Sequence, residues 1–258
     1  MGGFLLFSGK GKASGTKHVY QTTSDKIKEQ KIKETLLTTF DIEESKTEMP
    51  HYLLFDMETT GLPRDKTASI TKRGNNYPNI VQLAWIVTDM EGKYISQCNY
   101  ILKQSHPIPE RATAIHGITN ERAEAEGVSP EVALKEFYED AKSCKVVVAH
   151  NMEFGFPIVE TALLKHNLPM VLFDKKLICT MQTAKEKMRL GEYPELKDLW
   201  LECYLGSDKY YIVSFSYGRE HDAIIKVSIV KGCFFKMKEQ GIVSDDSLYL
   251  LPIKWKRQ

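Results

Sequence analysis

The sequence predicts an α/β protein from residue 50 onward. Short runs rich in β-branched and aromatic residues, which favour strands, alternate with segments whose apolar residues recur every three or four positions, as in helices. The chain has 258 residues, of which 42% are hydrophobic, and that supply can bury one substantial core. We therefore expect a folded domain over residues 50–258, preceded by a basic, amphipathic N-terminal arm over residues 1–49.

Four runs are predicted as strands: Tyr52–Met57, Ile80–Asp89, Tyr94–Leu102 and Val146–Ala149. The first three follow one another without a helical segment between them, which is typical of a meander. The fourth is wholly apolar and runs into a helical segment, as expected of a buried strand.

Five segments are predicted as helices: Ser129–Ala141, Pro157–Lys165, Ile178–Met188, Glu195–Tyr204 and His221–Gln240. Ser129 followed by Pro130 is typical of a helix start, with a capping residue before a proline in the first turn. The last helix places five apolar residues on one face, which predicts that it packs on the sheet. These residues are Ala223, Val227, Val230, Phe234 and Met237.

The first 49 residues differ in composition from the rest of the chain. A short apolar tip is followed by a segment rich in Gly, Ser and Lys, and then by a stretch rich in Lys and Glu. Within that stretch, Asp25–Glu44 forms either one amphipathic helix or a mobile surface arm. The apolar tip is too short for a signal peptide, and no apolar run is long enough to cross a membrane.

Charge and cysteine content limit the classes of protein. Lys and Arg (35) nearly balance Asp and Glu (34), so any binding to nucleic acid must come from local patches and not from an overall positive field. The five cysteines are widely separated and lie mostly in apolar segments, which indicates reduced core residues. We expect a soluble cytoplasmic protein with no membrane partner.

Two carboxylates stand one residue apart at the end of the first predicted strand. Asp56 and Glu58 project from the same face of that strand, because side chains at i and i+2 share a face. Hard oxygen ligands this close together suit Mg²⁺ or Mn²⁺. The alternative is a strand end with two solvated acids.

Three later segments of the sequence carry further motifs. They are Ala114-Ile-His116-Gly117-Ile-Thr119, predicted as a tight loop; His150-Asn151-Met-Glu-Phe154, after the fourth strand; and His221-Asp-Ala223, at the last helix. Taken in order, the motifs resemble the DnaQ-like 3′–5′ exonucleases of the His-containing DEDD type, a family that includes the proofreading epsilon subunit of bacterial replicative DNA polymerase. The resemblance spans about residues 51–240. It implies a ribonuclease H-like fold, with a mixed five-stranded sheet flanked by helices.

The resemblance also implies a metal-dependent phosphodiester hydrolase. In the family, four carboxylates hold two divalent ions, Mg²⁺ or Mn²⁺, and a histidine acts as general base. Asp56 and Glu58 match the first two carboxylates, and His221 matches the general base. The positions that match contacts to the terminal nucleotides are Thr59, Thr60, His116, Gly117, Asn151 and Phe154.

Each of these contact residues has both a binding role and a structural alternative. Thr59 and Thr60 can offer hydroxyl or amide donors to phosphate, and Phe154 can offer an apolar surface to a base. The alternatives are that Phe154 belongs to the core, that Asn151 caps its helix, and that His116 braces its loop.

Two positions depart from the family pattern. Gly155 stands where the third carboxylate is expected, and Lys226 stands where the fourth is expected. Glu153 lies two residues before Gly155, and Asp222 directly follows His221, but in helical geometry each points away from the expected direction. An ammonium about 4 Å from a cation repels it by roughly 4 kcal/mol per unit charge product, so metal binding is expected to be weak or lost.

Lys226 therefore has two interpretations. Either it replaces the metal electrostatically and forms an ion pair with Asp56 and Glu58, or it swings out to solvent and the site has decayed.

Three function classes follow: an active exonuclease, a pseudo-exonuclease that binds the 3′ end of single-stranded DNA or RNA, and a protein-interaction module. A polymerase or another replication or repair protein is a possible partner in all three. Two further segments bear on the choice. Residues 207–220 form an extra strand, a partner surface or a base-stacking patch, and the basic loop Arg64–Arg73 either follows a phosphate backbone or is solvated.

Overall fold

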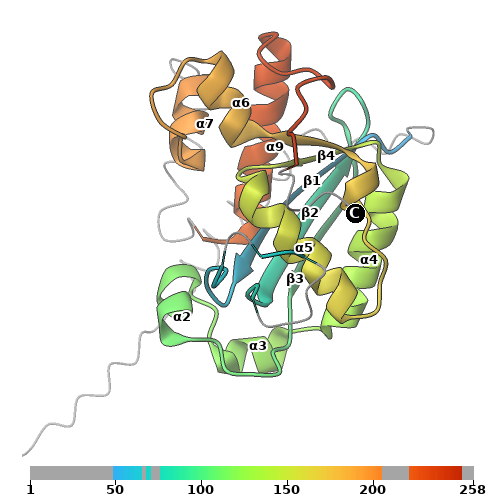
Figure 1. Cartoon of the computed structure of the whole chain (residues 1–258), viewed down its shortest axis with the longest axis vertical. Coiled ribbons are helices and arrows are strands. Elements are labelled where there is room, and N and C mark those ends of the chain that lie inside the picture. The colour runs from blue at the N-terminus through green and yellow to red at the C-terminus, as the bar shows by residue number, and fades with distance from the viewer. Residues whose placement is uncertain (1–48, 66–67, 71–75, 205–220, 252–258) are drawn as a thin grey trace, which may run out of the picture. The chain divides into compact units, whose positions relative to one another are not determined.

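The computed structural model describes residues 49–65, 68–70, 76–204 and 221–251 (Figure 1). The chain divides into two compact units, Met1–Asp41 and Ile42–Gln258, and every described residue belongs to the second. Three sequence predictions therefore lie wholly or partly outside the described residues: the arm over 1–49 with its helix, the segment 207–220, and most of the loop Arg64–Arg73.

A mixed five-stranded sheet forms the centre of the domain, as predicted. Its strands are β1 (Tyr52–Thr59), β2 (Ile80–Thr88), β3 (Tyr94–Ile101), β4 (Val146–Ala149) and β5 (Lys176–Cys179), in the order β3-β2-β1-β4-β5. The first three strands pair antiparallel, whereas β4 and β5 continue the sheet parallel to β1. The carboxyl ends of β1, β4 and β5 therefore lie at the same edge of the sheet.

Helices cover both faces of this sheet (Figure 1). They are α2 (Glu110–His116), α3 (Asn120–Glu126), α4 (Pro130–Ser143), α5 (Met152–Lys165), α6 (Thr180–Lys187), α7 (Leu196–Tyr204) and α9 (Ala223–Glu239), with a 3-10 turn at Leu172–Asp174. Helices α4 and α5 pack on one face, and α6, α7 and α9 pack on the other. The five residues predicted for the buried face of the last helix are all buried.

Three sequence predictions of elements were wrong in part. Ile178 and Cys179 belong to strand β5 and not to the following helix, because this strand is only four residues long and leads directly into α6. Helix α5 begins five residues before Pro157, which lies inside it. The predicted tight loop around His116 is the end of helix α2, which Gly117 terminates at a left-handed φ of 71°, where glycine is favoured.

Strand β1 alternates between the two layers. Leu53, Phe55 and Met57 belong to the core beneath α4 and α5. Tyr52 and Leu54 belong to the core beneath α9, and the alternation of strand side chains puts the two acids of the motif on that same face. Helix α9 is thus the element that faces the acids.

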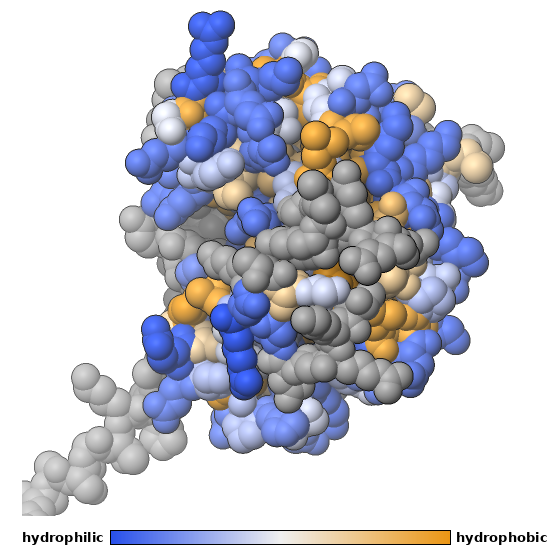
Figure 2. Space-filling view, in the orientation of Figure 1, coloured by the Kyte–Doolittle hydropathy of each residue, from blue (hydrophilic) through white to orange (hydrophobic). Residues whose placement is uncertain are grey.

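On the face shown in Figure 2, the described residues are mostly hydrophilic, and the apolar ones gather in small separate patches. All five cysteines are free thiols, and four of them are buried; Cys98 on β3 is half-buried. Within the described ranges, no helix combines the length and the apolar composition that crossing a bilayer requires.

Candidate functional site

Lys226 of α9 reaches both acids at the end of β1. Its Nζ lies 3.1 Å from Asp56 Oδ1 and 2.9 Å from Glu58 Oε1. The side chains are largely removed from solvent, with exposed fractions of 21% for the lysine, 14% for the aspartate and 8% for the glutamate. The predicted ion pair is confirmed, and the alternative of a lysine turned to solvent was wrong.

Asp222 starts helix α9 and does not replace the missing carboxylate. Its Oδ1 accepts a hydrogen bond from Ile224 N at 3.3 Å, which makes it the N-cap of the helix. The same oxygen accepts a hydrogen bond from Gln82 Nε2 at 2.8 Å. The carboxylate is therefore used to cap and anchor the helix.

Burial and the lysine act in opposite directions on the acids. Burial raises the pKa of Glu58 to about 7 against the opposing effect of Lys226, and the charges of Asp56 and Asp222 raise it further. Burial alone would lower the pKa of Lys226, but the two carboxylates outweigh that effect and raise it. The lysine is therefore charged at neutral pH, whereas the glutamate titrates there.

The titration of Glu58 predicts a pH dependence of stability. Because the native pKa is about 7 and the unfolded value is 4.5, the native protein binds more protons between these values, and stability falls as the pH rises through this window. Between about pH 5 and about pH 8, the free energy of unfolding of Glu58→Gln is expected to rise by on the order of 2 kcal/mol relative to that of the unmodified chain.

Urea unfolding at each pH measures this difference. Glu139→Gln, at an exposed position of α4, is the control and is expected to show no such trend. Parallel pH profiles for Glu58→Gln and the unmodified chain would contradict the assignment.

The position of the third carboxylate offers no ligand. A Cβ at Gly155 would lie 3.1 Å from the ring of Phe55, closer than ordinary van der Waals contact. Glu153, two residues earlier on α5, is exposed. Within the described part of the chain, no group of three His, Cys, Asp or Glu side chains has the arrangement of a metal site. The donor set at β1 therefore does not fit the cation pair that the family implies, because an ammonium already lies between its two acids and compensates one of their charges.

His116 presents an unpartnered polar atom at this site. Its Nδ1 accepts a hydrogen bond from Ile118 N at 3.1 Å, so the proton of the neutral ring is on Nε2. Burial lowers the pKa of His116, and the nearby His221 and Lys226 lower it further, which keeps the ring neutral. The buried Nε2 has no hydrogen-bond partner among the described residues. His116 thus braces its loop through Nδ1, and the backbone of Thr59 interacts with the same ring.

The other two histidines of the motifs differ in exposure. His221 is exposed and directly precedes Asp222, the N-cap of α9. It lies near enough to His116 to lower the pKa of that histidine. His150 is held by Thr180 Oγ1 at 3.0 Å and Pro194 O at 3.1 Å, and burial lowers its pKa to about 4. Sequence reasoning gave His150 no role; the structure shows it as a neutral brace between the start of α5 and the start of α6.

Only one of the two threonine hydroxyls can donate to a ligand. Thr59 Oγ1 donates to Gly61 O at 2.7 Å, so its proton is used within the turn. Thr60 Oγ1 accepts from Asn79 N at 3.0 Å, which leaves its proton available. Of the predicted hydroxyl or amide donors, the Thr59 hydroxyl and the Thr60 amide, which donates to Asn79 O at 2.9 Å, are already used, while the hydroxyl of Thr60 keeps the capacity to donate.

Asn151 and Phe154 lie at the start of helix α5. Asn151 occupies the N-cap position with φ 65° and ψ 59°, but its side chain makes no capping hydrogen bond. The alternative that Asn151 caps its helix is therefore confirmed in position, but the cap is formed by its backbone carbonyl, which accepts from Phe154 N at 3.0 Å and Gly155 N at 3.1 Å. Phe154 packs against the core and remains partly exposed, so it serves the core and also shows an edge to solvent.

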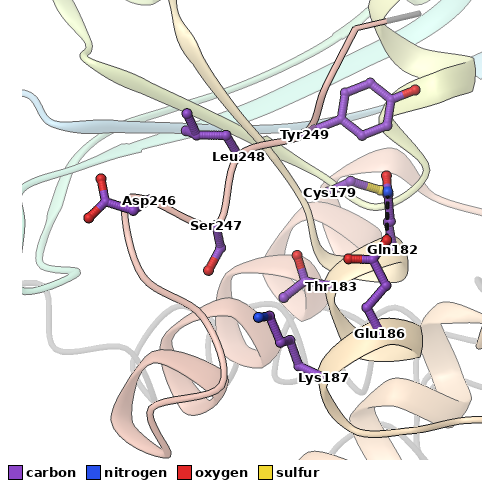
Figure 3. A pocket seen from close by; sticks show the side chains of 9 residues that line it. All are labelled: Cys179, Gln182, Thr183, Glu186, Lys187, Asp246, Ser247, Leu248 and Tyr249. Carbon is purple, nitrogen blue, oxygen red and sulfur yellow. Dashed lines mark hydrogen bonds between the residues drawn. The ribbon is translucent and has the colours of Figure 1, made fainter.

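A separate cavity of about 190 Å³ lies between α6 and the C-terminal segment (Figure 3). It shares no residue with the site at β1. Its lining consists of Cys179, Gln182, Thr183, Glu186, Lys187, Asp246, Ser247, Leu248 and Tyr249.

Comparison with known proteins identifies the family. The model of the RNase_T exonuclease family matches residues 53–208, which is more than half of the chain. The chain belongs to this exonuclease family. The resemblance to DnaQ-like exonucleases seen in the sequence is therefore confirmed.

The relatives share only part of their length with this chain. A PolC-type DNA polymerase III from Streptococcus pyogenes serotype M18 is 27% identical over 146 residues, which is 57% of this chain and 8% of the polymerase. The chain thus spans less than a tenth of that relative.

Two solved structures of exonucleases share the fold. Exonuclease I of E. coli, in a zinc-bound complex with single-stranded DNA, has a TM-score of 0.55 at 17% identity, over 73% of this chain and 40% of that one. Exonuclease X, in complex with 5′-overhanging duplex DNA, has a TM-score of 0.51 at 21% identity, over 76% of this chain and 96% of that one. The ribonuclease H-like exonuclease fold of this chain is thereby shown.

Proposed function

We propose that this exonuclease-family chain binds the 3′ end of single-stranded nucleic acid without metal-dependent cleavage. The observation that carries the proposal is Lys226 Nζ within about 3 Å of both remaining acids. Its positive charge occupies the space between the two acids and repels other cations there, and Gly155 adds no third ligand. Mg²⁺ or Mn²⁺ is accordingly expected to bind weakly or not at all.

The contacts that a nucleotide needs are better preserved than the metal ligands. Thr60 keeps a free hydroxyl proton, His116 keeps a buried Nε2 donor, and the Asn151 side chain is not used as a cap. These groups can bind phosphate, sugar or base atoms without a cation. Phe154 adds a partly exposed ring for a base, and Gly117 gives a ligand close access to the backbone.

The related proteins support a nucleic-acid ligand in the replication or repair machinery. Exonuclease I and exonuclease X are known in complexes with DNA, and the PolC-type relative is a DNA polymerase. We propose that this chain is a cytoplasmic protein that binds DNA or RNA ends. A polymerase or another replication or repair protein is its proposed partner. The exposed Arg64 at the end of the β1 turn adds positive charge for a phosphate backbone.

A second candidate function is residual metal-dependent exonuclease activity. It is favoured by the presence of Asp56, Glu58 and an exposed His221, which match two ligands and the general base of the family. A 3′-labelled oligonucleotide incubated with Mg²⁺ or Mn²⁺ separates the two functions. Our proposal expects binding without release of nucleotides; release at rates that exceed a Glu58→Ala control would favour the second candidate.

Binding is expected to depend on His116 and not on divalent ions. His116→Ala removes the buried Nε2 donor and should weaken binding of a single-stranded oligonucleotide by about tenfold, since a hydrogen bond to a charged group contributes about 1.5 kcal/mol or more. His106→Ala, at an exposed histidine ten residues earlier, is the matched control and should leave the affinity unchanged.

Fluorescence anisotropy with and without EDTA measures both expectations. The affinity should fall as salt rises and should be equal in EDTA and Mg²⁺. Affinity that requires Mg²⁺, or equal losses in the two histidine variants, would contradict the proposal. A chain that binds no oligonucleotide at all would favour a protein-interaction module.

A further inference from the structure

We infer that Gln82 is the positioning residue that holds the first turn of α9 on the sheet and thereby places Lys226 between Asp56 and Glu58. The side chain of Gln82 lies on strand β2, next to the central strand β1, directly opposite Glu58 in the β1–β2 register, and is only 4% exposed. Cross-strand neighbours share a face of the sheet, so Gln82 stands beside the ion pair and under the start of the helix.

Both ends of the Gln82 amide are used. Its Nε2 donates to Asp222 Oδ1 at 2.8 Å and to Asn99 Oδ1 at 2.9 Å, and its Oε1 accepts from Ala223 N at 3.1 Å. Asp222 and Ala223 are the N-cap and the first residue of α9. One buried side chain therefore ties β3, β2 and the beginning of α9 together in a single, partly buried network.

The helix transmits this anchor to Lys226. Lys226 N donates to Asp222 O at 3.0 Å, the first hydrogen bond of the helix. Residues four apart lie on the same face of a helix, one turn from each other. Fixing Asp222 and Ala223 against β2 therefore fixes the point from which the Lys226 side chain extends to the two acids.

The chemistry of this position requires an amide. The network needs two donated hydrogen bonds and one accepted one, and a glutamine side chain supplies all three. A glutamate at position 82 would bring a further carboxylate beside Asp222, and an apolar residue would leave Asp222 Oδ1 and Ala223 N without this partner. Gln82 acts through the helix and needs no contact with the lysine.

The test measures the coupling between Lys226 and Glu58 in different backgrounds. A double-mutant cycle of Lys226→Met and Glu58→Gln, read from urea unfolding, gives the coupling as a ratio of unfolding constants. We expect a coupling of at least about tenfold in the unmodified chain and less than about threefold after Gln82→Met. Trp85→Phe, which removes a 2.7 Å hydrogen bond to Asp140 from the opposite face of β2, is the matched control and should leave the coupling unchanged.

Two further measurements keep the inference falsifiable if Gln82→Met folds poorly. Gln82→Glu keeps the shape and removes the donor, and it should also reduce the coupling. The ¹⁵N signal of the Lys226 ammonium should be protected from exchange in the unmodified chain and in Trp85→Phe, but not in either Gln82 variant. Undiminished coupling or an unchanged ammonium signal in the Gln82 variants would overturn the inference. Because these readouts use no oligonucleotide, they stay decisive even if the proposed nucleic-acid binding fails.

Discussion

Replacing Lys226 with methionine is expected to lower the free energy of unfolding by about 3 kcal/mol near pH 8, because it leaves two buried carboxylates without their counter-charge. The ammonium lies 3.1 Å and 2.9 Å from the two acids, and all three side chains are largely buried. Near pH 5 the loss should be smaller, since Glu58, whose pKa burial raises to about 7, takes up a proton there.

A surface lysine on the same helix provides the control. Lys236 forms an exposed ion pair with Glu239 at 2.9 Å, and such pairs contribute about 0–1 kcal/mol. Lys236→Met should therefore change stability little at either pH. The triple variant Asp56→Asn, Glu58→Gln, Lys226→Met removes the charges together and should recover most of the loss. Equal effects of the two lysine substitutions would show that the buried ion pair does not stabilise the fold.

Restoring aspartate at both departing positions is expected to create metal binding and nuclease activity. Lys226→Asp replaces a repelling ammonium by a carboxylate, and a unit charge product at about 4 Å corresponds to roughly 4 kcal/mol, or about a thousandfold in cation affinity. Gly155→Asp adds the remaining carboxylate. Calorimetry should detect Mn²⁺ binding to the double variant, and a labelled oligonucleotide should be shortened from its 3′ end.

The structure identifies the main obstacle to this restoration. A Cβ at residue 155 would lie 3.1 Å from the ring of Phe55, so the ring must move by a few tenths of an ångström. Gly155→Ala measures the steric effect without adding a ligand and should bind no Mn²⁺. A stable double variant that neither binds Mn²⁺ nor cleaves would show that more than two positions have lost the metal-site geometry.

The sequence predicts most of the sheet because strands follow local pattern, and it offers the ion pair as one of two interpretations of Lys226. Strong apolar runs identify β1, β2 and β4, and the single residue between Asp56 and Glu58 places them on one face of a strand. The motif position of Lys226 left two interpretations open, an ion pair with the acids or a side chain turned to solvent, and the contact in the structure shows the ion pair. The short strand β5 was missed because four residues that lead directly into a helix have no distinct period.

Other features of the site depend on contacts between distant residues. Gln82 and Asp222 lie 140 positions apart in the chain, yet their hydrogen bond anchors α9. The engaged hydroxyl of Thr59 and the unpartnered Nε2 of His116 likewise depend on how the turns fold. Residue type alone shows that these side chains can form hydrogen bonds, but only the fold shows which of them are already used.

Titration of Mn²⁺ into the unmodified chain, followed by calorimetry, tests most directly whether Lys226 takes the place of the metal ions. The ion pair that joins Lys226 to Asp56 and Glu58 predicts no saturable heat below about 1 mM Mn²⁺, under conditions in which the chain restored with two aspartates binds. Micromolar binding of two ions per unmodified chain, with the Lys226 side chain displaced from the acids, would contradict this account.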